Sequence, residues 1–340
     1  PYRDLFASIN LQADEVIFGR DYEASLSVLH NVQNYENSTT MGRPGMNKKI
    51  VNSYLMADGS RFTDKAGYET MTFDQECQNR DPRLAQTILT PGYTRIGSTK
   101  KEAPNLAYTM TGYHLIKYSM TANYDEYNKS CNDIPLFRTA EVYLNFAEAK
   151  AELGTLKQAD INKSIKLLRD RVGMTNLDME LANSKPDPYL MSAATGYPNV
   201  KGANQGVILE IRRERTIELA MEGFRYYDIM RWKEGKLFEN DLLGIYVPGP
   251  GTYDLDKDGT DDVCFYVGTK PAGNVPLYLE IGEQIRLSNG ESGYIICHSL
   301  ITKKWNEDRD YLYPVPISER TLSNGVITQN PGWNDGLNFN

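Results

Sequence analysis

The stretch RRERTIELAMEGFRYYDIMRW, residues 212–232, combines many charged side chains with large apolar ones. It holds five arginines, three glutamates and one aspartate. Closely spaced carboxylates can serve as the acid and the nucleophile of a glycoside hydrolase, whereas carboxylates beside arginines can form structural ion pairs. The choice between these two roles depends on the helix that positions the side chains.

A helical reading of residues 207–222 brings the carboxylates of this stretch together. At about 100° per residue, one stripe of the helix carries Ile211, Glu214, Arg215, Glu218 and Glu222. Apolar side chains border the stripe on both sides, so we expect its carboxylates to be partly buried and to need cationic partners. The candidate partners within the stretch are Arg212, Arg213, Arg225 and Arg231. Asp228 is spaced to pair with Arg225 or Arg231.

Catalysis by this stripe is disfavoured on electrostatic grounds. Adjacent arginines lower the pKa of a carboxyl group, whereas a general acid needs a raised pKa. Carboxylates on one helix face are also poorly placed to lie on opposite sides of a scissile bond. The chain contains no G-x-S-x-G, no H-E-x-x-H and no phosphate-binding loop, and its three histidines are scattered. We therefore expect an ion-pair lattice and no catalytic residues.

The segment DLDKDGTDD, residues 254–262, resembles the first part of a calcium-binding loop. Its oxygen ligands at positions 1, 3, 5 and 9 would be Asp254, Asp256, Asp258 and Asp262. Gly259 stands at position 6, where the loop turns, but Phe265 stands at position 12, where an EF-hand has glutamate. The simpler alternative is a solvated turn without metal. We expect a structural Ca²⁺ that holds the loop, either with a ligand from elsewhere or with a different use of Asp261 and Asp262, and no other cofactor.

The composition excludes several classes of partner. With 37 basic and 45 acidic residues the net charge is -8, which gives no electrostatic basis for binding nucleic acid or anionic lipid. The four cysteines are far apart without a C-x-x-C pair, so neither zinc spacing nor a disulfide framework is indicated. The 23 tyrosines and three tryptophans suit either a core that reaches solvent or a surface that stacks against sugars.

Three regions differ in their patterns. Residues 1–133 are rich in turn signals and predict a loop-rich region, and residues 236–340 predict loops, short strands near 263–267 and 294–298, and an extended tail. Residues 134–235 are helical in pattern, with expected helices at 139–153, 161–172, 207–222 and 224–233. The first two helices form an αα-hairpin of the tetratricopeptide type.

Four segments resemble the SusD/RagB family. They are FRTAEVYLNFAEAKAELG, RRERTIELAMEGFRYYDIMRW, NRDPRLAQTIL and the closing YLYPVPISERTLSNGVITQNPGW, which occur in the order that the family uses. The resemblance implies a mainly α fold: a SusD-like α-α superhelix of tetratricopeptide-like helix pairs with a large loop-rich region and a few short β-strands. It also implies that residues 1–340 are a single domain, corresponding to the C-terminal two thirds of a family chain without its N-terminal helices.

The resemblance further implies a surface-exposed lipoprotein of the outer membrane of Bacteroidetes. Such a protein binds extracellular glycan without turning it over and delivers it to a SusC-like TonB-dependent transporter. Contact with the membrane is expected only through an N-terminal lipid anchor, which is absent from this chain. The alternative function is a peptide-binding or protein-interaction scaffold of the RagB or tetratricopeptide type.

Candidate ligand residues are aromatic and polar side chains in loops. The segment after NRDPR offers Tyr93, Arg95 and Tyr108, and weaker candidates are Tyr35 and Trp305. A tyrosine or tryptophan ring can cover the apolar face of a sugar, and arginine can bind its hydroxyl groups. Core packing is the alternative role for each aromatic ring.

Overall fold

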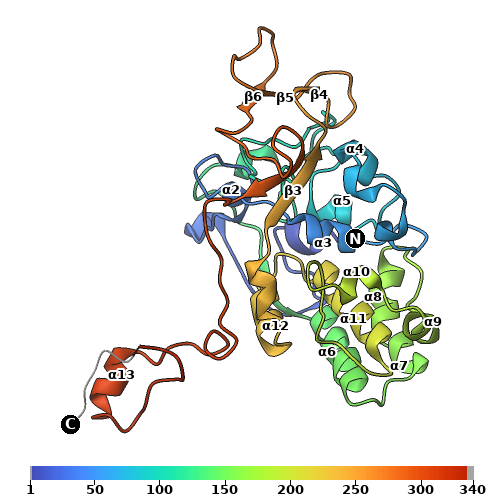
Figure 1. Cartoon of the computed structure of the whole chain (residues 1–340), viewed down its shortest axis with the longest axis vertical. Coiled ribbons are helices and arrows are strands. Elements are labelled where there is room, and N and C mark those ends of the chain that lie inside the picture. Colours follow the sequence, from blue (N-terminus) through green and yellow to red (C-terminus); the bar gives the residue numbers. More distant parts are fainter. Residues whose placement is uncertain (1, 335–340) are drawn as a thin grey trace.

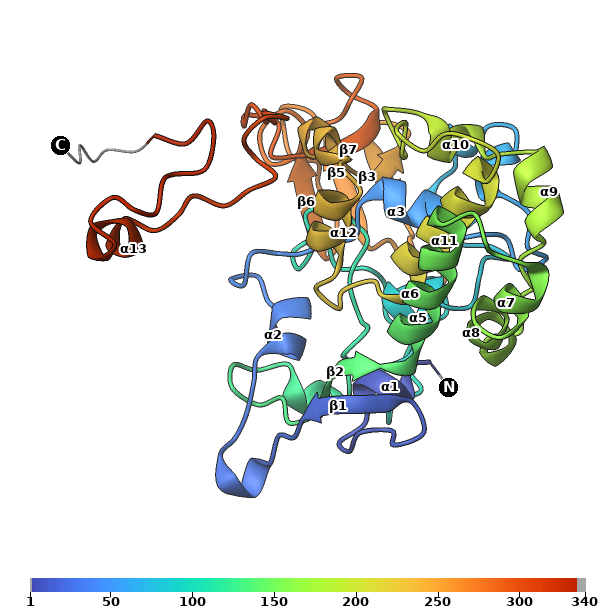
Figure 2. The ribbon, with the colours of Figure 1, turned by 90° about the horizontal axis from the view of Figure 1, so that it is seen from below.

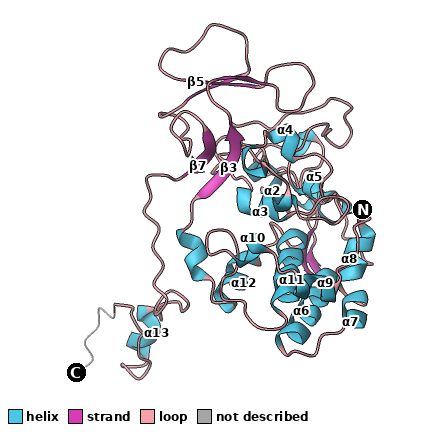
Figure 3. Cartoon of the chain, turned by 45° about the vertical axis from the view of Figure 1, so that its right-hand side comes forward, coloured by secondary structure: helices cyan, strands magenta, loops and turns pink. Residues whose placement is uncertain are grey.

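The computed structural model describes residues 2–334, in which helices outnumber strands (Figure 1). The α-helices are α1 (Asp4–Ala7), α2 (Val32–Glu36), α3 (Lys48–Ser53), α4 (Phe73–Glu76), α5 (Leu84–Thr87), α6 (Thr139–Glu152), α7 (Gln158–Asn162), α8 (Ile165–Arg171), α9 (Met179–Ser184), α10 (Pro188–Met191), α11 (Gln205–Glu218), α12 (Arg225–Arg231) and α13 (Ile317–Leu322). The strands are β1 (Val16–Arg20), β2 (Ile134–Arg138), β3 (Leu242–Val247), β4 (Gly251–Tyr253), β5 (Val263–Tyr266), β6 (Leu277–Glu280) and β7 (Gly293–Cys297). The longer helices and the strands β3, β5 and β7 occupy different parts of the molecule (Figure 3).

Helices α6 and α11 pack against each other and form the centre of the helical part (Figure 2). The buried face of α6 repeats at helical spacing through Ala140, Leu144, Ala147 and Ala151. Three of these residues are alanines, whose small side chains let the two backbones approach closely. The helix expected at 139–153 is therefore confirmed.

The helix expected at 161–172 is wrong as a continuous element. The chain forms α7 and α8 instead, with a break at Ser164, whose backbone angles are φ -134° and ψ -90°. The Ser164 hydroxyl donates to the carbonyl of Asp160 at 2.7 Å, which gives the backbone a local alternative to helix. The apolar stripe survives the break, because Ile161, Ile165 and Leu168 are all buried.

The charged stretch forms two helices with a turn between them. Helix α11 is buried from Gly206 to Glu218, where it ends, four residues before the predicted end. The turn passes through Met221 and Gly223, at φ 65° and 85°, and α12 begins at Arg225. Gly223 suits this left-handed conformation because it has no Cβ. The two predicted helices are confirmed, but the break between them begins at Leu219, before the predicted Gly223.

The strands form three small sheets. β1 and β2 pair antiparallel, β3 and β7 pair antiparallel, and β5 lies between an antiparallel β4 and a parallel β6. The strands expected near 263–267 and 294–298 are confirmed as β5 and β7. Apolar side chains of β3, β5 and β7 join a core with α3, α4 and α5, which carries the loops of residues 89–116.

Residues 302–334, here called the C-terminal arm, first pack beside α12 and then extend away from the rest of the chain (Figure 1). The arm contains α13, which the sequence patterns did not predict. Gln329 donates to and accepts from the backbone of Val315, and the indole N–H of Trp333 donates to the carbonyl of Leu312. The arm is thus closed on itself by hydrogen bonds. Among the described helices, none has both the length and the apolar character required to span a bilayer.

Candidate functional site

A cavity of about 580 Å³ lies between the loop of residues 95–108 and the acidic loop of residues 254–262. We call it the loop cavity. Its walls combine cationic, anionic, amide and aromatic side chains, including Arg95, Lys100, Lys101, Asn105, Tyr108, His114, Asp256, Asp258, Asp261 and Asp262. The sequence predicted Arg95 and Tyr108 as ligand residues and the acidic loop as a metal-binding loop. In the structure, both groups of residues line the same cavity.

Arg95 holds one wall of the loop cavity in position. Its Nη1 lies 2.8 Å from Asp125 Oδ1, and its Nη2 lies 3.1 Å from Asn37 Oδ1 and 3.4 Å from Glu102 Oε2. Only 6% of Arg95 is exposed. The guanidinium therefore joins α2, the loop before β2 and the cavity wall itself, and its first role is to fix the shape of that wall.

Tyr108 supplies the aromatic surface of the cavity. Its ring is half-buried and meets the imidazole of His114 edge-on, with centroids 5.8 Å apart. Burial lowers the pKa of His114 to about 4, so its ring is neutral at pH 7. Nε2 of His114 lies 3.0 Å from the carbonyl oxygen of Glu36, to which it donates, and Nδ1 accepts from the backbone N–H of Asn105 at 3.4 Å. His114 is therefore a structural residue that orients Tyr108.

The other three predicted ligand residues lie elsewhere. Tyr93 is only 7% exposed and packs with Leu89 and Ile116, and its hydroxyl accepts from Arg3 Nη2 at 3.0 Å. This burial leaves the ring little surface for stacking against a ligand. Tyr35 is 44% exposed on α2, and Trp305 belongs to an aromatic group beside α12.

Three aspartates of the acidic loop gather as a cation site would require. Ligand oxygens of Asp254, Asp256 and Asp262 all lie within 4.8 Å of one another. Burial, together with the neighbouring carboxylates, raises the pKa of Asp262 to about 6. A divalent cation would relieve the repulsion among these carboxylates, and three close carboxylates fit such an ion.

Asp258 has a different place from the one predicted. Its backbone N–H donates to Asp254 Oδ1 at 3.2 Å and to Asp256 Oδ1 at 3.0 Å, while its carboxylate accepts from the N–H of Thr260 at 2.8 Å. Its side chain is exposed and lines the loop cavity outside the three-carboxylate group. The loop spacing could not distinguish a ligand from a side chain that caps the turn.

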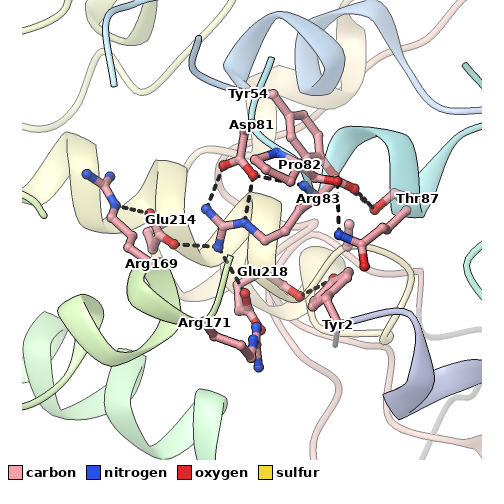
Figure 4. Close-up of polar contacts among 12 residues, drawn as sticks. Tyr2, Tyr54, Asp81, Pro82, Arg83, Thr87, Arg169, Arg171, Glu214 and Glu218 are labelled. Carbon is pink, nitrogen blue, oxygen red and sulfur yellow. Dashed lines mark hydrogen bonds and ion pairs between the residues drawn. The ribbon is translucent and has the colours of Figure 1, made fainter. Parts of the chain in front are cut away.

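The carboxylates of α11 form a buried ion-pair lattice (Figure 4). Arg83 Nη1 lies 2.6 Å from Glu214 Oε1 and 2.9 Å from Glu218 Oε2. Burial alone would raise the pKa of Glu218, but arginines from three segments hold it well below its usual range. A general acid cannot work in such surroundings. The expected lattice is therefore present.

The predicted partners within this lattice are mostly wrong. Glu214 pairs with Arg83 and Arg169, and Glu218 pairs with Arg83, Arg138 and Arg171, all from outside the charged stretch. Two arginines of the stretch itself bind other carboxylates, because Arg212 binds Glu234 and Arg213 binds Glu210. Arg231 binds Asp228, and this predicted pair is confirmed. Arg225 donates to the hydroxyl of Thr216 instead. Helical spacing predicted which carboxylates share the buried stripe, but it could not predict the distant arginines that neutralise them.

A family model described as the SusD family matches residues 14–333. The chain belongs to this family. A search of curated proteins found no match. Among solved structures, a SusD-like protein from Bacteroides fragilis has a TM-score of 0.60 and 21% identity over 98% of this chain and 57% of its own. A SusD-like carbohydrate-binding protein from the same species has a TM-score of 0.56 and 21% identity over 95% and 56%, respectively. This member of the SusD family thus spans a little over half the length of both relatives.

Proposed function

We propose that this member of the SusD family binds extracellular glycan in the loop cavity without chemical turnover. The observation that carries the proposal is the meeting of Tyr108, Arg95 and the acidic loop around one cavity of about 580 Å³. This volume is typical of small-ligand sites. One solved relative is described as carbohydrate-binding, which supports the same class of ligand.

The cavity walls suit a sugar better than a purely apolar ligand. The ring of Tyr108 can lie against the apolar face of a sugar ring, while Lys100, Lys101 and Asn105 can donate to its hydroxyl groups. Asp258 and Asp261 on the opposite wall can accept from them. These groups do not form a nucleophile–base pair, so the arrangement supports recognition of a ligand and not its chemical conversion.

The proposal includes the setting implied by the family. The protein would act at the outer-membrane surface as a lipoprotein and hand its glycan to a SusC-like TonB-dependent transporter. Its helices α6 to α11 would form part of a tetratricopeptide-like α-α superhelix. The protein can be purified from detergent-solubilised outer membranes. Co-purification of such a transporter would support the partnership, and purification of the protein without a transporter would count against the partnership.

Affinity electrophoresis tests the binding role. Gels containing starch, arabinoxylan, galactomannan or mucin should each be compared with a gel without polysaccharide, and at least one should slow the protein. The substitution Tyr108→Ala should weaken this retention, whereas Tyr127→Ala should not, because Tyr127 is 71% exposed and does not line the loop cavity.

Tyr93→Ala provides a second comparison. It should lower the melting temperature through the lost core packing and leave the intact fraction able to bind, because Tyr93 is buried. Equal retention of the Tyr108 variant and the unsubstituted protein would reject the loop cavity as the site. Binding of peptides with no retention by any glycan would favour the scaffold alternative.

A further inference from the structure

A run of aromatic side chains covers the junction between α12 and the C-terminal arm. Ring centroids lie 6.3 Å apart between Tyr313 and Tyr226, 5.8 Å between Tyr226 and Phe238, and 5.3 Å between Phe238 and Trp305. The angles between the ring planes are 34°, 40° and 34° in the same order. We call these four side chains the aromatic row.

The row is fixed by the backbone beside it. A Cβ at Gly235 would lie 2.0 Å from Cε2 of Trp305, so the indole packs directly on the glycine. The backbone N–H of Trp305 donates to Glu239 Oε1 at 2.8 Å, and the N–H of Gly235 donates to the hydroxyl of Tyr311 at 3.0 Å. Rings that are already held in place lose little conformational freedom when a ligand binds.

Two tyrosines of this junction are open to solvent. Tyr313 is 64% exposed, and Tyr227, whose ring meets that of Tyr226 edge-on at 5.5 Å, is 62% exposed. Phe238 and Trp305 are half-buried beside them. Single exposed apolar residues are ordinary, but a contiguous group of exposed rings marks a contact surface.

The chemistry of the row favours a glycan over a protein partner. A tyrosine offers an apolar face with a hydroxyl group at its edge, which matches a sugar ring with an apolar face and hydroxylated rim. The solvent-accessible side chains of Lys236 and Glu239 can bind hydroxyl groups at the foot of the row. By contrast, the β1–β2 pair exposes apolar side chains without hydroxyl groups, namely Ile17, Phe18, Leu136 and Phe137.

We propose that the aromatic row, together with Tyr227, is a second contact for the glycan that the loop cavity binds. This inference rests on the proposed function. The described residues that line the loop cavity include none of the row, and α12 lies away from β4, β5 and β6 (Figure 1). A glycan long enough to reach both places is held more tightly than a short one, because the second contact becomes intramolecular.

The test compares a polysaccharide with a trisaccharide of the same composition. The polysaccharide is whichever of starch, arabinoxylan, galactomannan or mucin retards the unsubstituted protein. The double variant Tyr227→Ala/Tyr313→Ala should lose about tenfold in affinity for it, the order expected when two stacking contacts are removed. Binding of the trisaccharide, which fits within the loop cavity, should stay unchanged by isothermal titration.

Two variants separate ring contact from effects on the arm. Tyr227→Ala alone alters α12 and not the arm, and it should account for part of the loss at an unchanged melting temperature. Tyr313→Phe keeps the ring and should retain most of the affinity. Tyr127→Ala is the matched control, since that tyrosine is also exposed but belongs neither to the aromatic row nor to the lining of the loop cavity.

The outcomes distinguish this inference from the proposed function. If the double variant bound the polysaccharide as tightly as the unsubstituted protein, the second contact would be overturned. The loop cavity would then remain the proposed site. The same result combined with loss of a co-purifying membrane protein would assign the row to a protein partner and would also overturn it. No retardation of the unsubstituted protein by any polysaccharide would overturn both proposals.

Discussion

Arg138 donates two hydrogen bonds to Glu218. Its Nη1 lies 2.7 Å from the carboxylate oxygen Oε1, and its Nη2 lies 2.8 Å from the backbone carbonyl oxygen of the same residue. Glu218 is the last residue of α11, where backbone carbonyls have no partner within the helix. One arginine from the end of β2 therefore both pairs with a buried carboxylate and caps the helix that carries it.

Replacement of Glu218 by glutamine should strongly destabilise the protein. The substitution would keep the shape of the side chain but remove the negative charge that faces Arg83, Arg138 and Arg171. Breaking a buried ion pair in this way costs about 3–5 kcal/mol. The measurement is chemical denaturation monitored by circular dichroism, with polysaccharide retention of the folded fraction measured in parallel.

The matched control for Glu218→Gln is Asp170→Asn. Asp170 pairs with Lys166 on α8, with both side chains more than two-fifths exposed, so its loss should change the free energy of unfolding by less than about 0.5 kcal/mol. A Glu218 variant as stable as this control would show that the lattice does not hold α11. Lost retention at unchanged stability would instead place Glu218 in ligand binding.

Sequence periodicity was sufficient for the main helices because their buried faces repeat locally. Ala140, Leu144, Ala147 and Ala151 fall on one side of a helix whatever packs against them. The partners of Glu214 and Glu218 could not be obtained in this way. Arg83 comes from more than 130 positions away, and only the folded chain brings it to α11.

The candidate site was predictable only in part for the same reason. Tyr93 and Tyr108 are both loop tyrosines in the sequence, but only the folded structure shows that the first packs against Leu89 and Ile116. The spacing of the acidic loop was enough to predict that Asp254, Asp256 and Asp262 lie close together, because residues within one short loop are local. It could not show that the loop faces Arg95 and Tyr108 across a cavity.

Calcium should bind the acidic loop. Asp254, Asp256 and Asp262 offer three close carboxylates, and sites of this kind with few ligands have a Kd of about 0.1–1 mM. Isothermal titration after treatment with a chelator should show one site per chain. Asp256→Asn should abolish it, and Asp261→Asn, outside the three-carboxylate group, should leave it intact.

Hydrogen exchange should show whether bound calcium holds the acidic loop in place. If the ion holds the loop, exchange of the backbone amides of residues 254–262 should slow on calcium addition, while amides of α6 should be unaffected. Failure to detect binding at millimolar calcium would contradict the metal site and support the solvated turn.

Glu36 should make stability depend on pH. Burial raises the pKa of its carboxyl to about 7 from the usual 4.5, despite donation by Ser119 and the backbone N–H of Tyr118 and attraction to Arg95. Between these two values the unfolded chain ionises while the folded chain retains its proton. The contribution of Glu36 to stability is thus full below about pH 4.5, falls as the pH rises and is lost above about 7.

The substitution Glu36→Gln isolates this contribution. The free energy of unfolding, measured by urea titration at several pH values, should decline less between pH 5 and 7 in the variant than in the unsubstituted protein. The charged neighbours Arg95 and Asp125 are unchanged in both, which makes the difference specific to Glu36. Glu180→Gln, an exposed change in α9, should leave the decline as it was. Identical slopes for Glu36→Gln and the unsubstituted protein would rule out the shift.

Gly235→Ala should release the C-terminal arm from α12. The added Cβ would lie 2.0 Å from Cε2 and 2.1 Å from Nε1 of Trp305, and both are ring atoms that cannot yield without moving the indole. Trp305 anchors the start of the arm through Phe238 and Glu239, so its displacement should free the residues that follow.

Limited proteolysis should then cut within residues 306–316 faster than in the unsubstituted protein, while the helical part stays intact. Glu180→Gln, an exposed change in α9, should leave the cleavage rate unchanged. Cleavage of both variants at the same rate would mean that the arm is held by its own hydrogen bonds, such as those between Gln329 and Val315, and not by the indole.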